Sequence, residues 1–287
     1  MIRLKFHARR ELLFALLLLP SVLGLLVFFI VPFVLSAQMG MIDNPVGRNF
    51  VGLSHFTATL GNPAFQLAIR NTTTFILLSV PLNMVFALLI AMMLRRVSGF
   101  WKGILGTFFI LPLVVPSGSV VHFWQSLFGL NGFFNGLFFG EPINWLNMDH
   151  SLYFVVFIFL WKNVGFNIVL MLAGLNLIPK EYYENAAICG AGQFRQFSSI
   201  TLVYLMPTTF MALLLSIVQS FQAFREIFLL TGPFPHTSLY MLQHYLNNQF
   251  AALDYQRMVA ASYILTLGIV AIVLVMLRVQ RRVMNYD

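Results

Sequence analysis

Six long stretches without charged side chains alternate with polar segments along this chain. Five of them contain no Asp, Glu, Lys or Arg, and the fourth in order contains one charged residue, Lys162. A helix needs about 20 apolar residues to cross the hydrocarbon core of a bilayer, and every stretch reaches that length. The pattern therefore predicts six transmembrane helices, at residues 12–35, 71–94, 104–128, 152–177, 201–224 and 258–277.

The first stretch follows a basic segment, so a cleaved signal peptide is the alternative to a transmembrane helix. Its apolar part is about twice as long as the ~7–15 residues of such a signal, and no clear small-x-small cleavage site closes it. We therefore expect residues 1–11 to be a cytoplasmic N-terminus, followed by a single transmembrane domain at residues 12–287.

The composition also indicates a chain that lies in lipid. Hydrophobic residues make up 59% of the sequence and charged residues 9%, whereas about a quarter of the residues of soluble domains are charged. The mean hydropathy is +0.84. Together with the six stretches, this composition predicts an all-α integral membrane protein.

Lysine and arginine are distributed unevenly over the segments that join the stretches. Twelve of them lie in the N-terminus, the second and fourth connections and the C-terminal tail, whereas four lie in the other connections. Since cytoplasmic loops carry an excess of these residues, both termini and the insert at residues 178–200 are predicted to be cytoplasmic. The net charge of +8 comes from basic residues that are scattered at the expected membrane edges. They form no continuous basic stripe of the kind that binds nucleic acid.

The sequence lacks the motifs that an enzyme or a self-powered pump would need. No lysine follows a glycine, which excludes a phosphate-binding P-loop. The six histidines show no spacing typical of a metal site, and the single cysteine, Cys189, excludes an internal disulfide. We expect no catalytic residue, no metal site and no cofactor in this chain.

The insert at residues 178–200 is polar and favours helices, although it lies between two apolar stretches. Pro179 suits the first turn of a helix, and Gly-Ala-Gly at residues 190–192 should end that helix. Residues 193–199 can form a second short helix. Two short helices joined at glycine predict a rigid, protruding knob that a soluble partner can bind.

The spacing within this insert carries a family resemblance. The motif begins with Glu184 and Ala186, which are separated by one residue. After three further residues comes Gly190, and after nine more the Ile-x-Leu of Ile200 and Leu202. The pattern resembles the EAA loop of binding-protein-dependent ABC importer permeases. Asn185, Cys189 and Val203 replace the Ala, Asp and Pro that are usual at those places, and the size and turn geometry of the loop survive these replacements.

Further stretches resemble the sugar-importer branch of that family, the maltose and glycerol-phosphate type. They are Val51-Gly52-Leu53, Asn144-Trp145-Leu146, Trp161, Gly165-Phe166, Leu172-Ala173-Gly174-Leu175, Ile178-Pro179, Ser220-Phe221-Gln222 and Thr231-Gly232. The stretch Gly232-Pro233-Phe234-Pro235 departs from the usual Gly-Gly-Gly-Pro, in a loop expected on the delivery side.

The resemblance implies a type I ABC importer permease fold in a bacterial or archaeal plasma (inner) membrane. The insert would dock onto a separate ATPase through the coupling residues Glu184, Ala186, Ala187, Gly190 and Ala191. Two ATPase subunits would bind ATP and magnesium. A second permease, related but not identical, and an extracytoplasmic substrate-binding protein would complete an importer for a carbohydrate. A polyol or phosphorylated polyol is the alternative substrate, and a self-sufficient secondary transporter is the alternative class.

Polar and aromatic side chains share faces of the fourth and fifth predicted helices, where a sugar could pass. The candidates are Phe159, Lys162, Asn163 and Phe166 on the fourth helix and Gln219, Ser220, Gln222 and Ala223 on the fifth. Lys162 would lie ~15 Å inside its helix at 1.5 Å per residue, where a lysine must face water or a partner. Structural pairing inside the bundle is the alternative role for Lys162.

Overall fold

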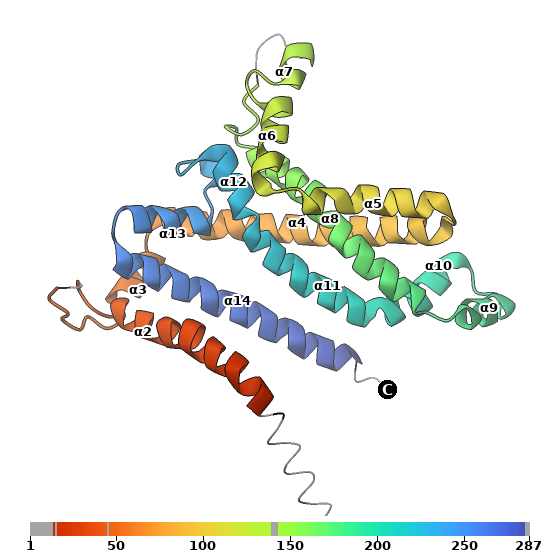
Figure 1. Cartoon of the computed structure of the whole chain (residues 1–287), viewed down its shortest axis with the longest axis horizontal. Helices are drawn as coiled ribbons and strands as arrows, with labels where there is room; N and C mark the ends of the chain where they lie inside the picture. Colours follow the sequence, from red (N-terminus) through yellow and green to blue (C-terminus); the bar gives the residue numbers. More distant parts are fainter. Residues whose placement is uncertain (1–13, 15, 45, 139–142, 285–287) are drawn as a thin grey trace, which may run out of the picture. The chain divides into compact units, whose positions relative to one another are not determined.

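The computed structural model describes residue 14 and residues 16–44, 46–138 and 143–284, which are predominantly helical (Figure 1). No strand occurs in this part of the chain, where Ile42 and Phe50 form an isolated antiparallel bridge. The predicted all-α fold is confirmed. The N-terminus expected at residues 1–11 and the beginning of the first expected span lie outside the described residues.

Five helices of the described part are long and apolar enough to cross a membrane, and a bent pair of helices could form a sixth span. The five are Leu16–Met39, Pro63–Arg96, Ser151–Asn176, Gln193–Thr231 and Tyr255–Arg282. The bent pair is Phe100–Val114 with Ser117–Leu137. The chain is therefore a multi-pass membrane protein.

The described residues form two compact units. One unit comprises the described residues within 1–62 and 249–267. Its helices are the π-helix η1 (Leu26–Ile30), α2 (Val31–Met39), α3 (Ser54–Leu60) and the first part of α14 (Tyr255–Met284). Tyr263 of α14 stacks on Phe33 of α2 with ring centroids 4.6 Å apart, and its hydroxyl donates to the Phe33 carbonyl oxygen. No residue of η1 or α2 is buried.

The other unit comprises the described residues within 63–248 and 268–287. Its elements are α4 (Pro63–Arg96), α5 (Phe100–Val114), α6 (Ser117–Phe128), α7 (Phe133–Phe138), α8 (Ser151–Asn176), α9 (Lys180–Ile188), α10 (Gln193–Gln196), the π-helix η2 (Phe197–Thr201), α11 (Leu202–Gln222), α12 (Phe224–Thr231), the 3-10 helix η3 (Thr237–Leu239), most of α13 (Leu242–Ala251) and the end of α14.

Helix α8 is central in this second unit and packs against α4, α5 and α11 (Figure 1). Two glycines permit the close packing. A Cβ added at Gly165 would lie 1.9 Å from the carbonyl oxygen of Phe109 in α5, and one added at Gly174 would lie 2.6 Å from Thr208 Oγ1 in α11. Small residues at helix contacts let membrane helices gain van der Waals contact where the hydrophobic effect is weak.

The third predicted span, at residues 104–128, is not one helix. Helices α5 and α6 meet at a bend of 101°. The bend lies at Val115, whose φ of −70° and ψ of 127° are extended. Proline disfavours the helical conformation at the residue before it, so Pro116 ends α5. Pro112, by contrast, stays inside α5.

The fifth predicted span, at residues 201–224, is longer than expected at both ends. The helical segment runs over Gln193–Thr231, through η2, α11 and α12. Its predicted end was set by the first charged residue, Arg225, but the helix continues past this residue. Arg225 and Glu226, expected in an outside loop, therefore belong to α12. The second span likewise begins earlier than expected, at Pro63.

Candidate functional site

A network of three side chains joins α6, α8 and α12. The ammonium group of Lys162 donates to Oε1 of Glu226 and forms an ion pair with it. Lys162 Nζ also donates to Ser117 Oγ at 3.3 Å, and Ser117 Oγ donates to Glu226 Oε1 at 2.5 Å. The side chains of Lys162 and Glu226 are only 15% and 11% exposed.

The electrostatics of this network explain why its members occur together. Each of the two ions loses several kcal/mol of hydration when it is taken out of water. Opposite charges 4 Å apart recover about 4 kcal/mol at an effective dielectric constant near 20, and Ser117 supplies a further hydrogen bond to the carboxylate. The pair is neutral as a whole, so neither ion is buried uncompensated.

A polar cavity of about 180 Å³ lies beside the network. Its lining residues are Leu113, Ser117, Lys162, Asn163, Gln219, Gln222, Ala223, Arg225 and Glu226. Gln219 Oε1 is buried and has no hydrogen-bond partner within the described residues. The lining thus offers amide and charged groups to a solute that carries hydroxyl groups.

The structure gathers five of the eight candidates from α8 and α11 around this cavity and places three elsewhere. Phe159 is buried in the core and meets the Phe75 ring edge to face, with centroids 5.5 Å apart. Ser220 is buried and donates to the Ile217 carbonyl oxygen of its own helix at 2.6 Å. Phe166 is half-buried and is not part of the lining.

Sequence reasoning missed three polar residues of the site, Ser117, Arg225 and Glu226, and the apolar Leu113. A lysine inside a span calls for an anionic partner, and Glu226 follows the uncharged stretch of the fifth span by two positions. That signal could have identified the pair. Ser117 gave no signal, because its position depends on the bend between α5 and α6. Both roles considered for Lys162 coexist, since it is paired and also lines the cavity.

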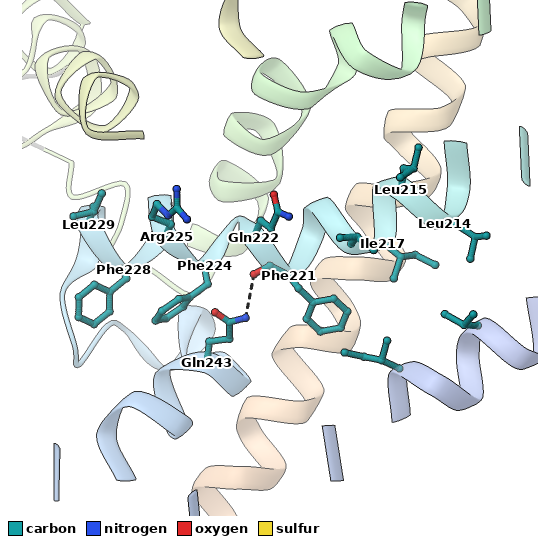
Figure 2. Close-up of a pocket in the computed structure, with 13 residues that line it drawn as sticks. Leu214, Leu215, Ile217, Phe221, Gln222, Phe224, Arg225, Phe228, Leu229 and Gln243 are labelled. Carbon is teal, nitrogen blue, oxygen red and sulfur yellow. Dashed lines mark hydrogen bonds between the residues drawn. The ribbon is translucent and has the colours of Figure 1, made fainter. Parts of the chain in front are cut away.

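A larger, mainly apolar cavity of about 870 Å³ runs along α11, α12 and the end of α14. Figure 2 shows Phe221, Phe224 and Phe228 on the side of α11 and α12 that faces Gln243, whose amide donates to the Phe221 carbonyl oxygen at 3.2 Å. Gln222 and Arg225 point to the opposite side (Figure 2). These two polar residues line both cavities.

The insert after α8 forms the predicted knob. Pro179 precedes α9 with a φ of −58° and a ψ of 140°, and α9 ends before Cys189. Gly190 has a φ of +79°, a left-handed conformation that costs other residues about 1–2 kcal/mol. The Ala191 N–H then donates to the Ala186 carbonyl oxygen at 2.9 Å, which closes the end of the helix.

One tyrosine anchors the knob to the rest of its unit. The hydroxyl of Tyr183 shares a hydrogen bond of 2.9 Å with Thr201 Oγ1 in η2. Arg95, near the end of α4, donates to the same hydroxyl at 3.3 Å, and its guanidinium carbon lies 5.3 Å from the ring centroid. Helix α9 is therefore held at a fixed place between α4 and η2.

The remainder of the knob is largely uncovered. Glu184, Ala187 and Gly190 are exposed, whereas Ala186 and Ala191 are half-buried. Two large apolar side chains, Ile188 and Phe194, are 84% and 83% exposed. These two side chains and the accessible Glu184, Ala187 and Gly190 leave the surface of the knob open to a partner.

Comparison with known proteins agrees with this geometry. Residues 83–285 match the family described as the binding-protein-dependent transport system inner membrane component. The chain is 33% identical over 241 residues to the trehalose/maltose transport system permease protein MalF of Thermococcus litoralis, covering 80% of this chain and 81% of that one. It is 30% identical over 278 residues to the sn-glycerol-3-phosphate transport system permease protein UgpA of Agrobacterium fabrum, covering 93% and 94%.

A solved structure has the same fold. A chain of a bacterial ABC transporter involved in the import of the acidic polysaccharide alginate matches with a TM-score of 0.84 and 24% identity. The match covers 98% of this chain and 99% of that one.

Proposed function

This chain belongs to the family of binding-protein-dependent transport system inner membrane components, and we propose that it forms the translocation path of an ATP-driven importer for a carbohydrate. The resemblance drawn from the EAA spacing is confirmed by the family match. The chain is a transport subunit, and two separate ATPase subunits would bind ATP and magnesium. A second, non-identical permease and an extracytoplasmic binding protein would complete the assembly in a bacterial or archaeal plasma membrane.

The exposed α9 knob is the observation that carries the proposal. Tyr183 holds the knob at the end of α4, while Glu184, Ala187 and Gly190 remain accessible on its surface. The chain continues as helix from α10 through η2 into α11. A displacement of α10 by a docked ATPase would therefore reach α11, which lines the polar cavity, through continuous helix.

The polar cavity supports a carbohydrate as the substrate. Amide groups of Asn163, Gln219 and Gln222 can exchange hydrogen bonds with sugar hydroxyl groups. The relatives named for trehalose and maltose and for arabinooligosaccharides, at 33% identity each, point the same way. The relative named for sn-glycerol-3-phosphate keeps a phosphorylated polyol as the second candidate.

Reconstitution of the complete importer tests the proposal. The chain, its ATPase, its second permease and its binding protein are assembled in liposomes, and ATP-dependent uptake of labelled sugars is measured. Gly190→Pro and Glu184→Lys should each weaken ATPase binding and uptake about tenfold or more, since 1.4 kcal/mol of docking energy corresponds to tenfold. Asp149→Lys, at a side chain 92% exposed in the segment before α8, is the matched control and should leave both unchanged.

Two results would contradict the proposal. Uptake that persists without any ATPase would identify a self-sufficient secondary transporter. Normal ATPase binding and uptake in both knob variants would remove the knob from energy coupling. Competition between neutral sugars, polyols and polyol phosphates separates the substrate candidates.

A further inference from the structure

We propose that the polar cavity selects a substrate with an anionic group, a saccharide or polyol that carries a carboxylate or a phosphate, and that Arg225 is the selecting residue. This inference rests on the proposed function, because it takes the 180 Å³ cavity to be part of the transport path.

The charges around the cavity do not balance. Its lining contains three charged side chains, those of Lys162, Arg225 and Glu226. Lys162 and Glu226 are in direct contact, so that their charges cancel. Among the described residues, Arg225 takes part in no hydrogen bond or ion pair of its side chain. The lining therefore keeps one net positive charge, on a guanidinium group that is free to bind.

The position of Arg225 makes its charge accessible to a solute. It directly precedes Glu226 on α12, and consecutive residues of a helix point about 100° apart, at 3.6 residues per turn. Arg225 can thus stay outside the pair that its neighbour forms. Its side chain is exposed and lines both the polar cavity and the larger groove. It projects from α12 on the same side as Gln222 (Figure 2).

The chemistry of the lining fits an anionic sugar better than a neutral one. A guanidinium group binds carboxylate or phosphate through two parallel hydrogen bonds. The amides of Asn163, Gln219 and Gln222 lie around the same cavity and can bind hydroxyl groups. Gln219 Oε1, buried without a partner in the described part, is an acceptor still available for such a hydroxyl. The guanidinium of Arg225 can bind one anionic group, and the surrounding amides can bind the hydroxyl groups of the same molecule. The lining therefore matches a sugar or polyol with a single negative charge.

The test uses the complete reconstituted importer and matched probes. Labelled glucuronate and glycerol 3-phosphate are the anionic probes, and glucose and glycerol are their neutral counterparts. Binding to the nucleotide-free importer and ATP-dependent uptake are both measured. The wild-type protein should prefer each anionic probe, and Arg225→Gln should lower that preference about tenfold or more, as expected for a hydrogen bond to a charged group. Arg225→Lys should retain part of the preference.

Arg70→Gln is the control, because it removes the same charge from an exposed residue of α4 that does not line the cavity. It should leave the preference unchanged. Circular dichroism checks that both variants are folded. A wild-type preference for the neutral probes, or an equal preference in Arg225→Gln and wild type, would overturn the inference.

The two proposals fail in different ways. ATP-dependent uptake of neutral sugars that is indifferent to Arg225→Gln would overturn anion selection and leave the importer intact. Loss of all ATP-dependent uptake would contradict the importer, whereas Arg225-dependent binding of glucuronate to the same preparation would still support anion selection.

Discussion

The buried ion pair between Lys162 and Glu226 makes a sharp prediction about stability. Lys162→Met should destabilise the protein by about 3–5 kcal/mol, because removal of one partner leaves the other charge buried and uncompensated. The side chains are 15% and 11% exposed, so most of each charged group is out of contact with bulk water. Glu226→Gln should cost a similar amount, since Lys162 is then left without its counter-ion.

The double variant separates this explanation from simple loss of packing. Lys162→Met combined with Glu226→Gln removes both charges and should be far more stable than the sum of the single variants predicts, with a stability close to that of the wild type, because replacing a buried pair with neutral groups is often neutral. Ser117→Ala should cost about 1 kcal/mol, the usual net value of one hydrogen bond.

Equilibrium unfolding in mixed micelles, followed by circular dichroism, measures these differences as a double-mutant cycle. Additive effects, with each single variant below about 1 kcal/mol, would be typical of a solvated surface pair. That result would refute the assignment of a buried, coupled network.

Three further predictions concern other parts of the second unit. Gly165→Ala should lower the unfolding free energy by about 1–3 kcal/mol, because the added Cβ would meet the Phe109 carbonyl oxygen. The control Gly106→Ala in α5, which has open space around it, should leave the unfolding free energy unchanged. Equal melting temperatures of the two variants would contradict the close contact between α5 and α8. Tyr183→Phe removes the hydroxyl that anchors the knob and should reduce uptake per ATP hydrolysed; unchanged coupling would show that the anchor is dispensable. Burial lowers the pKa of His244 from 6.5 to about 4, so the unfolded state binds more protons between these values. Stability should then fall by up to about 3 kcal/mol as the pH drops from 6.5 to 4; His244→Gln should flatten this dependence in pH-dependent melting, and an unaltered slope would exclude this histidine as the cause.

Features set by neighbouring residues were predicted well from the sequence. Pro179 and Gly190 fix the beginning and the end of α9 through their own backbone preferences. The apolar stretches identify membrane-crossing helices because bilayer thickness demands a minimum length.

Features set by distant residues were not predicted. The fifth predicted span continues past its first charged residue, Arg225, into α12. Glu226, the next residue, is paired with Lys162 on α8, 64 positions away in the sequence. A partner at that distance cannot be recognised from the local sequence. The composition of the cavity shows the same limit. Its α8 and α11 members could be selected from one helical face each, but Ser117 reaches it only through the bend at Val115.

The π-helix η2 gives the knob a property that depends on chain length. A π turn accommodates one residue more than an α turn, and this one lies at Phe197–Thr201, between the knob and α11. Each residue in a helix advances the rotation by about 100°. Loss of a single residue here would turn the knob by about that angle around the axis of α11. The direction in which the knob faces is therefore determined by a count of residues, and a one-residue deletion would misalign it even with every contacting side chain retained.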